Sequence, residues 1–544
     1  MTPVVPHGGL RVTEHPPVAL LDGNARLPRT LLGNKGYGID AMRRHGLPVP
    51  AAFGITTEVC AQFFTDPERC LDSIWDHVCN KMRWLERATS RGFGRGPRPL
   101  LVSVRSSAAQ SMPGMMDTVL NVGIDDAVED ALAAASSAEF ARDTRDRLRE
   151  MYRRIVLGGD ESAQVPEDPG EQLREAIKAV FSSWNSERAI AYRTHHGYNH
   201  LDGTAVVVQA MVFGNMALDS GTGVLFSRNP VTGANEPFGE WLPGAQGEDV
   251  VSGTFDVEPI TALRDEQPAV FEQLLAAAHT LEQRGRDVQD IEFTVEEGTL
   301  WLLQTRVAKR SAQAAVRLAL QLRNEGLIDE AQALRRVTSA DVETLLQPSL
   351  QPETRLAAPL LAKGLAACPG VASGKAYTDV DEALDAAEEG EDVILVRTFT
   401  RPDDVQAMLA ARAIVTEIGG ATSHAAVISR EIGRPAVVGC GAGVAEGLRG
   451  KLITVDGTEG EAREGVLELT AWSENDNPDL HELADIARKI SPLRAHASGD
   501  YPVLENSSER AVRAAMTAGH TDVVCPTPLI TMLTALNLTD DNRK

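Results

Sequence analysis

The sequence predicts a multidomain protein of mixed α/β class, and three observations support this. The chain has 544 residues, which is more than one hydrophobic core usually organises. Short apolar segments typical of strands alternate with glycine-rich turns over residues 18–120, and strand-like segments return after residue 203. Between them, residues 125–195 have helical periodicity and are rich in Ala, Glu and Arg, which indicates a helical insertion.

Changes in composition divide the chain into expected domains. Three prolines in the segment 346–360 predict a linker. This linker separates a first domain, 18–345, from a second domain, 361–470. A second polar linker then leads to a last segment, 480–544.

The composition is that of an acidic, soluble protein. The formal net charge of −24 argues against nucleic acid or an anionic membrane as a partner. No apolar run approaches the roughly 18 residues that a membrane-spanning helix needs. The six cysteines include no CxxC pair, which argues against zinc or a disulfide framework. No basic region followed by an apolar core is visible near the N-terminus, and the scattered cysteines fit a reduced compartment, so we expect a cytoplasmic protein.

Two basic residues of the first domain occupy positions suited to binding phosphate. Residues 31–38 (LLGNKGYG) predict a flexible loop that holds Lys35, with a helix from Ile39 onwards. Residues 99–106 predict a strand that ends on Arg105. Lysine and arginine side chains can neutralise phosphates, although a solvated surface charge is the more common role of either residue. No GxxxxGK[ST] sequence is present, so a P-loop fold is not indicated.

The residues from Asp290 to Arg306 predict a β-hairpin with polar side chains on one face. Both halves alternate with a period of two around a Glu-Glu-Gly-Thr sequence. If Glu297–Thr299 form a three-residue loop, Glu292 lies opposite Gln304 and Asp290 lies opposite Arg306. A two-residue loop would break this pairing. Two acids and an amide suit Mg²⁺ bound to nucleotide phosphates, because Mg²⁺ prefers oxygen ligands.

The second domain contains the sequence Gly419–Val427 (GGATSHAAV), which predicts a phosphoryl-accepting histidine. Thr422 and Ser423 are N-cap residues, so we expect His424 in the first turn of a helix that ends at Gly433. Free backbone N–H groups and the helix dipole there disfavour imidazolium and favour an anion. A neutral imidazole that attacks a phosphoryl group needs these conditions. The alternative is a histidine that only packs or caps.

Over about its first 470 residues the chain resembles the pyruvate phosphate dikinase family of PEP-utilising enzymes. Related phosphoenolpyruvate synthases share the histidine motif, but the sequence SMPGMMDT points to the dikinase. The stretches that carry the resemblance are residues 31–36, 101–118 (LVSVRSSAAQSMPGMMDT), 209–214, 219–223, 246–251, 289–306 (QDIEFTVEEGTLWLLQTR) and 419–440.

The resemblance implies an ATP-grasp nucleotide domain with a helical insertion, followed by a swivelling phosphohistidine domain. In the family, ATP phosphorylates the histidine in two partial reactions, giving AMP and, with phosphate as co-substrate, pyrophosphate. By resemblance, His424 is the phosphorylated histidine, and Lys35 and Arg105 bind phosphates. Thr422 matches a position that is a regulatory phosphorylation site in some relatives. The loop that closes over the phosphates matches Gly114, Met115, Met116 and Asp117, and the nucleotide and Mg²⁺ cluster matches Asp290, Glu292, Gln304 and Arg306.

The last segment departs from the family pattern. The family continues into a (β/α)₈ barrel of roughly 250 residues that binds Mg²⁺, pyruvate and phosphoenolpyruvate. Residues 493–497, 508–518 and 522–525 resemble its first strand, first helix and second strand, so the chain carries a short, truncated barrel remnant. An Arg-Thr-Glu sequence that helps to bind phosphate in the family corresponds here to Pro526-Thr527-Pro528. We therefore expect the pyruvate site to be absent from this chain.

Three functions stay open at this point. The first is a phosphotransferase whose acceptor is presented by a separate protein or a small molecule. The second is direct phosphorylation of a small molecule, as in the rifampicin-inactivating relatives. The third is a non-catalytic relic that binds nucleotide and regulates a partner, which the intact set of charged residues disfavours. ATP, Mg²⁺ and phosphate are the expected ligands, and family resemblance suggests a homodimer.

Overall fold

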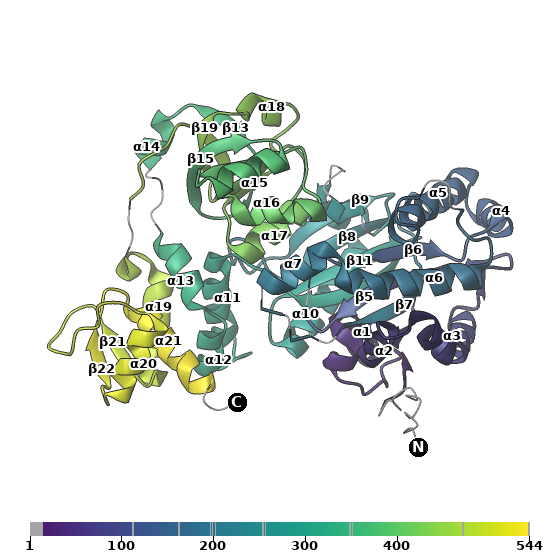
Figure 1. Ribbon diagram of the computed structural model, residues 1–544, viewed down its shortest axis with the longest axis horizontal. Helices are drawn as coiled ribbons and strands as arrows, with labels where there is room; N and C mark the ends of the chain where they lie inside the picture. The colour runs from purple at the N-terminus through teal and green to yellow at the C-terminus, as the bar shows by residue number, and fades with distance from the viewer. Residues whose placement is uncertain are drawn as a thin grey trace, which may run out of the picture. The chain divides into compact units, whose positions relative to one another are not determined.

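The structure is a computed structural model that contains two compact units (Figure 1). The first unit consists of Met1–Gly223, Pro243–Gly247 and Ile291–Arg306, and the second consists of the remaining segments. The multidomain, mixed α/β prediction is confirmed. Residues 15–541 are described, except for residues 111, 113, 161–163, 196, 199, 202, 248, 253, 254, 256, 348, 349, 351, 471 and 472.

A five-stranded antiparallel sheet organises the first unit. Its strands follow the order β1-β2-β7-β5-β6. Their bounds are β1 (Val18–Leu20), β2 (Ala52–Ile55), β7 (Thr204–Ala210), β5 (Val102–Ala108) and β6 (Thr118–Val122). Alternate residues of the strands point to opposite faces. Val104 and Val208 join the large core on one face, whereas Arg105 and Ser107 lie on the other.

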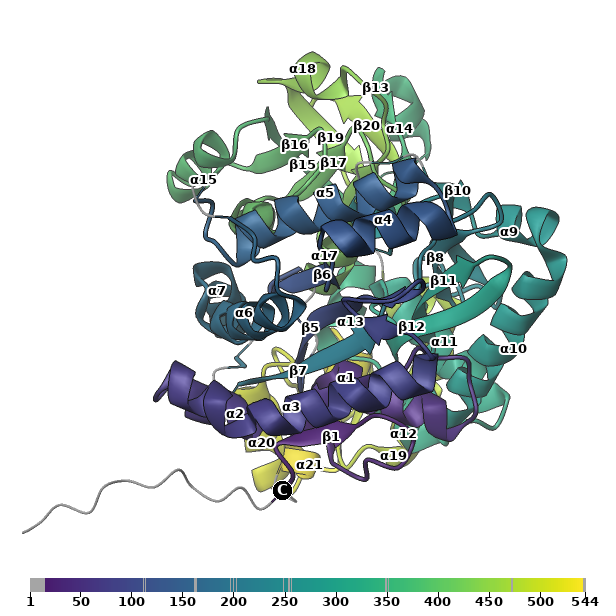
Figure 2. The ribbon, with the colours of Figure 1, turned by 90° about the vertical axis from the view of Figure 1, so that its right-hand side faces the viewer.

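The predicted helical insertion is confirmed as a set of helices around this sheet. It comprises α4 (Asp126–Ala135), α5 (Ala138–Ile155), α6 (Pro169–Ser182), η1 (Ser183–Asn185) and α7 (Glu187–His195). Helices α2 (Thr57–Phe63) and α3 (Pro67–Thr89) precede it, with strands β3 (Gly92–Phe93) and β4 (Pro99–Leu100). Figure 2 shows α4 beside α5 at one end, and α1 and α3 at the other. Buried residues of α3, α5 and α6 form one core with the valines of the sheet.

A second five-stranded sheet has the order β10-β9-β8-β11-β12. Its strands are β8 (Gly221–Phe226), β9 (Phe238–Pro243), β10 (Glu258–Pro259), β11 (Gln289–Glu296) and β12 (Thr299–Val307). Helices α8 (Asp249–Ser252), α9 (Thr261–Glu266) and α10 (Pro268–Gly285) connect β9, β10 and β11 along the chain.

The hairpin β11–β12 has a shorter turn than the sequence predicted. Only Glu297 and Gly298 form the turn, with φ of 49° and 69°, so the three-residue loop is wrong. Glu292 and Gln304 nevertheless hydrogen-bond to each other. Ala308 N also donates to Val288 O. Ala308 lies four residues after Gln304, and Val288 lies four residues before Glu292, so this bond has the same register as the Glu292–Gln304 pair. The pairing therefore shifts by one residue between the turn and Gln304, which restores the predicted contact.

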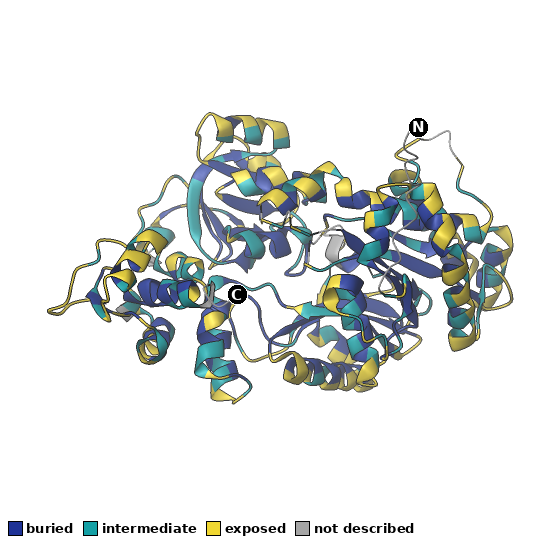
Figure 3. Ribbon diagram, turned by 60° about the horizontal axis from the view of Figure 1, so that its bottom comes forward, coloured by how far each residue is buried: buried dark blue, intermediate teal, exposed yellow. Residues whose placement is uncertain are grey.

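An eight-stranded sheet forms the histidine-bearing domain of the second unit. The order is β13-β20-β19-β15-β16-β17-β18-β14, and apolar cores cover both of its faces. The strands are β13 (Leu360–Lys363), β14 (Leu365–Cys368), β15 (Val371–Tyr377), β16 (Val393–Arg397), β17 (Ala413–Thr416), β18 (Ala436–Val438), β19 (Leu452–Asp456) and β20 (Glu461–Glu464). The helices are α15 (Val380–Glu388), η2 (Pro402–Asp404), α16 (Val405–Ala410), α17 (His424–Ile432) and α18 (Val444–Leu448). Figure 3 shows the strands mainly in dark blue and outward helix faces in yellow.

The last segment shares a core with helices that precede the histidine domain. Buried residues of α11, α12 and α13 pack with α19, α20 and α21 in one apolar cluster. The bounds are α11 (Ala312–Asn324), α12 (Glu330–Arg335), α13 (Ser339–Leu346), η3 (Glu474–Asp476), α19 (Pro478–Ile490), α20 (Glu509–Thr517) and α21 (Pro528–Asp541). Strands β21 (Arg494–His496) and β22 (Asp522–Val524) pair in parallel. The predicted strand–helix–strand elements of the remnant are therefore confirmed.

The predicted linker 346–360 contains a short helix, α14 (Pro352–Ala357). The domain boundaries themselves stay predictions. Within the part of the chain that the structure describes, no helix combines the length and the apolar character that crossing a bilayer requires.

Candidate functional site

Arg105 lies at the centre of a polar cluster in the first unit. Its Nη2 donates to Glu292 Oε2 at 3.2 Å and to Gln304 Oε1 at 3.0 Å. Its Nη1 donates to Gln209 Oε1 at 3.3 Å. Arg105 stands inside β5 rather than at its end, so the predicted position at a strand end is wrong. The structure thus brings together three predicted residues, Arg105, Glu292 and Gln304, and adds Gln209.

The cluster contains oxygen donors of the kind that Mg²⁺ prefers. A carboxylate oxygen of Glu292 and the amide oxygen of Gln304 converge on one cationic nitrogen of Arg105. These two oxygen atoms already surround a positively charged group. Mg²⁺ is a cation that prefers oxygen ligands of this kind. Asp290 is buried two residues earlier in β11, and Arg306 lies two residues after Gln304 in β12. The donor chemistry fits Mg²⁺, and its binding stays a prediction.

Lys35 belongs to helix α1 (Arg29–Arg44), so the predicted flexible loop is wrong. Gly33 interrupts the helix with φ of 67° and ψ of 177°. A Cβ atom at this residue would lie 1.7 Å from Ser107 O, so only glycine allows α1 to approach β5. The Ser107 hydroxyl fixes the approach, because it donates to Leu32 O at 2.8 Å and accepts from Gly36 N at 3.0 Å. These bonds anchor the helix segment of Lys35 to the strand of Arg105.

The loop predicted to close over phosphates is held by an arginine that sequence reasoning missed. Arg188 of α7 pairs with the Asp117 carboxylate and donates to Met115 O at 3.3 Å. Asp117 N also donates to Ser183 Oγ at 3.2 Å. Gly114 has φ of 69° and Met115 is fully buried, whereas Met116 is partly exposed. The motif residues Ser111, Pro113 and Glu248 lie outside the described residues.

His424 is the first residue of α17, as predicted. Ser423 is the N-cap residue and its hydroxyl accepts from Ala426 N at 3.4 Å, whereas Gly433 ends the helix with φ of 65°. Thr400 Oγ1 lies 3.0 Å from His424 Nδ1. Nε2 is buried and has no hydrogen-bond partner among the described residues. Burial lowers the pKa of His424 to about 4, so the imidazole is neutral at physiological pH.

A buried glutamate holds the loop in front of His424. The Glu240 carboxylate, on β9, accepts from the backbone N–H groups of Ala421 and Thr422 and from the Thr422 hydroxyl. Burial raises the pKa of Glu240, and these donors oppose the shift. A Cβ at Gly420 would lie 2.0 Å from Glu240 Oε1, so glycine is required beneath the carboxylate. From inside the domain, Arg430 Nη2 donates to Ala421 O at 2.7 Å. Thr422 is buried, and its regulatory role stays a prediction.

The arrangement can support nucleophilic chemistry at one nitrogen. In a neutral imidazole one ring nitrogen carries the proton and the other is nucleophilic. If Thr400 accepts the proton of Nδ1, the lone pair lies on Nε2. Thr400, Glu240 and Arg188 are distant in sequence from the residues that they contact, so no local motif could have identified them.

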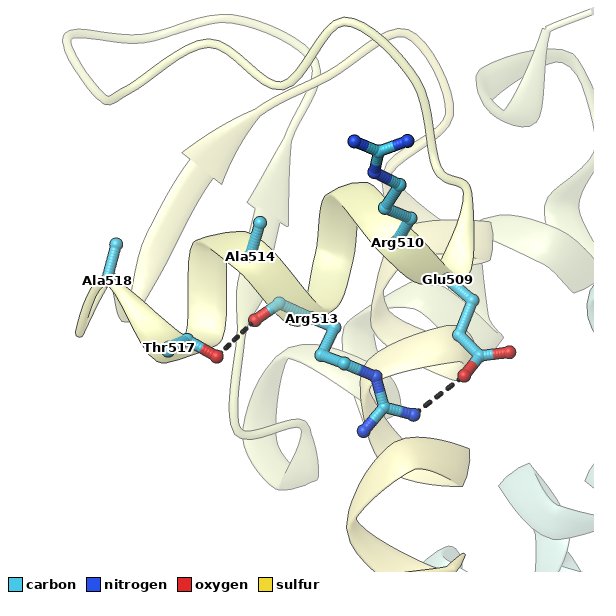
Figure 4. Close-up of a pocket in the computed structure, with 6 residues that line it drawn as sticks. All are labelled: Glu509, Arg510, Arg513, Ala514, Thr517 and Ala518. Atoms are coloured by element: carbon cyan, nitrogen blue, oxygen red, sulfur yellow. Dashed lines mark hydrogen bonds and ion pairs between the residues drawn. The ribbon is translucent and has the colours of Figure 1, made fainter.

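A separate surface pocket carries none of these residues. It lies along α20 and is lined by Glu509, Arg510, Arg513, Ala514, Thr517 and Ala518 (Figure 4). Arg513 pairs with Glu509 at 2.7 Å, and the Thr517 hydroxyl donates to Arg513 O at 2.8 Å. Because all six residues come from one helix and its C-cap, the pocket is a shelf on the surface rather than a site that several elements build.

Two family descriptions match the chain. Residues 72–272 match the "Pyruvate phosphate dikinase, AMP/ATP-binding domain" family. Residues 389–460 match the "PEP-utilising enzyme, mobile domain" family. The first match covers Arg105 and the loop before β6, and the second covers His424 with its supporting Thr400.

Several curated relatives are similar over most of the chain. "Pyruvate, phosphate dikinase" of Clostridium symbiosum is 38% identical over 537 residues, which is 88% of this chain and 61% of the relative. The protein of the same name from Rhizobium meliloti is 38% identical over 85% of this chain and 59% of its own length. "Pyruvate, phosphate dikinase 1, chloroplastic" of Oryza sativa is 40% identical over 77% of this chain and 49% of its own length. The chain thus spans about half to three-fifths of these relatives.

Proposed function

Because the chain carries the AMP/ATP-binding domain of pyruvate phosphate dikinase and the mobile domain of PEP-utilising enzymes, we propose that it is an ATP-dependent phosphotransferase that carries a phosphoryl group on His424. The single observation that supports the proposal most directly is that Nε2 is buried and has no hydrogen-bond partner in the part of the chain that the structure describes. A low imidazole pKa keeps this nitrogen unprotonated.

In the proposed reaction, the Nε2 lone pair attacks phosphorus, a P–N bond forms, and a P–O bond breaks with its electron pair on the leaving oxygen. If AMP is the leaving group, the attacked atom is the β-phosphorus, because only that attack breaks the bond to the AMP oxygen. This attack leaves a diphosphoryl group on His424. Transfer of its terminal phosphoryl group to phosphate then yields pyrophosphate and phosphohistidine.

The nucleotide end of this reaction is assigned to the polar cluster of the first unit. Arg105 and Lys35 would neutralise the phosphates. Asp290, Glu292 and Gln304 would hold Mg²⁺. When bound, Mg²⁺ would offset phosphate charge. Arg188, through Asp117, would keep the loop over the phosphates ordered.

The acceptor is proposed to be a small molecule or a group on a separate protein. A homodimer is proposed from the relatives alone.

Product analysis tests this function. Wild-type protein is incubated with MgATP, with and without phosphate, and nucleotides and pyrophosphate are separated by chromatography. We expect AMP in stoichiometric amounts, with pyrophosphate only when phosphate is present, and neither from His424→Ala. The matched control is His279→Ala, an exposed histidine outside the site, which should behave as wild type. ADP as the only product, or equal AMP release from His424→Ala, would refute the proposal.

A further inference from the structure

Asn121 is a buried residue with a backbone conformation that asparagine rarely adopts inside a strand. Its φ is 60° and its side chain is fully buried. The register between β5 and β6 shifts between the pairs Val102–Val122 and Val104–Val119, which leaves an extra residue in β6. Asn121 thus lies in a β-bulge, where a positive φ is usually met by glycine. A residue other than glycine at this φ points to a role for its buried side chain.

The Asn121 amide begins a chain of hydrogen bonds whose direction is fixed. Its Nδ2 donates to Thr144 O at 3.2 Å and to Gln246 Oε1 at 3.3 Å. Gln246 Nε2 donates to Asn215 Oδ1 at 3.4 Å, and Asn215 Nδ2 donates to Asp143 Oδ2 at 2.9 Å. A carboxylate can only accept, so Asp143 sets the orientation of Asn215, then of Gln246. The chain therefore requires a donor at Asn121.

Gln246 belongs to a loop that lies against the hairpin of the polar cluster. A side chain at the next residue, Gly247, would lie 3.6 Å from Leu303 Cδ1 and 4.0 Å from Thr222 Oγ1. Leu303 immediately precedes Gln304 in β12. The Thr222 hydroxyl donates at 3.1 Å to the carbonyl of Phe293, which follows Glu292 in β11. The loop therefore lies against the neighbour of Gln304 directly, and against the neighbour of Glu292 through Thr222.

Asn121 also belongs to the strand that pairs with the strand of Arg105. It is three residues after Thr118, which pairs with Arg105 across β5 and β6. The first unit thus has two links from β5–β6 to the β11–β12 hairpin. One is direct, from Arg105 to Glu292 and Gln304. The other runs from Asn121 through Gln246.

We propose that Asn121 is a positioning residue that holds the Gln246 loop, and through it the hairpin of Glu292 and Gln304, at the spacing that nucleotide binding requires. The inference rests on the proposed function. When Arg105 turns to a phosphate, its bonds to Glu292 and Gln304 are exchanged for bonds to the ligand, so the direct link is lost. The Asn121–Gln246 link does not involve ligand-binding atoms and persists through this exchange.

A double-mutant cycle tests the proposal. Binding of α,β-methylene ATP with Mg²⁺, an analogue whose α–β bond resists cleavage, is measured by calorimetry on wild type, Asn121→Gly, Gln246→Ala and the double variant. Glycine relieves the positive φ and removes only the side chain. Each single change should raise Kd about tenfold, because one oriented hydrogen bond and its buried partner are lost. The double variant should bind about as weakly as either single variant, since both remove the same link.

Ser90→Gly is the matched control, because Ser90 also has a positive φ, of 54°, but is exposed at the end of α3. It should leave Kd unchanged. Thermal unfolding of every variant separates loss of fold from loss of positioning. Asn121→Gly that binds as tightly as wild type, or single effects that add in the double variant, would overturn the inference. A wild-type protein that fails to bind the analogue would instead refute the proposed function, on which the inference depends.

Discussion

Replacing Thr400 with valine tests the proposal that His424 Nε2 is the nucleophile. Attack by Nε2 requires the proton on Nδ1, and Thr400 Oγ1 lies 3.0 Å away, within reach to accept that proton. Valine keeps the branched shape but removes this acceptor. A hydrogen bond of this kind contributes about 1 kcal/mol net, so the fraction of His424 in the reactive tautomer and orientation should fall. That energy corresponds to about a fivefold slower phosphorylation of His424.

The assay is single-turnover phosphorylation with excess MgATP, quenched in base and followed by intact mass. Thr398→Val is the matched control, because Thr398 is exposed two residues away. The loss should appear in the rate and not in the nucleotide concentration that gives half the maximal rate. A Thr400→Val protein that is folded and phosphorylated at the wild-type rate would refute this account of the tautomer.

Three further predictions concern His424, the loop in front of it, and the loop that Arg188 holds. Burial lowers the pKa of His424 from 6.5 to about 4, so His424 should stay nucleophilic from pH 7 down to about pH 5. Its contribution to folding stability should be lost as pH falls from about 6.5 towards 4. A rate of His424 phosphorylation that halves near pH 6.5 would contradict this. Glu240→Gln keeps one acceptor oxygen but removes the negative charge to which three groups donate hydrogen bonds. Proteolysis of the loop around Thr422 should therefore be about fivefold faster. An unchanged rate of proteolysis would contradict the role of this contact. Arg188→Met removes the ion pair with Asp117 and should weaken nucleotide affinity by about threefold to tenfold, with little change in unfolding temperature. A variant that binds nucleotide as tightly as wild type would show that the ion pair does not order the loop.

Elements with strong local signals were predictable from sequence. The cap at Ser423 and the stop at Gly433 define α17, because capping hydroxyls and left-handed glycines act within one turn. The strand–helix–strand pattern of the remnant was expected from family resemblance alone, and the structure adds that the Ser508 hydroxyl caps α20. Apolar periodicity and terminal residues together specify such elements without knowledge of their neighbours.

Features that depend on distant contacts were not predictable. The glycines around Lys35 predict a loop, whereas Gly33 is a kink within α1 that allows close approach to Ser107, far along the chain. The hairpin turn was one residue too long, because period-two alternation does not reveal a shift of register. Thr400 and Glu240 carry no motif of their own, and their roles come only from what the fold brings beside them.

The most direct test of the central claim is the intact mass of the protein after incubation with MgATP. The account predicts one acid-labile, base-stable phosphoryl group in the presence of phosphate, located by mass spectrometry on His424 and absent from His424→Ala. A wild-type protein that gains no phosphate, or one that gains it at another residue, would contradict the account.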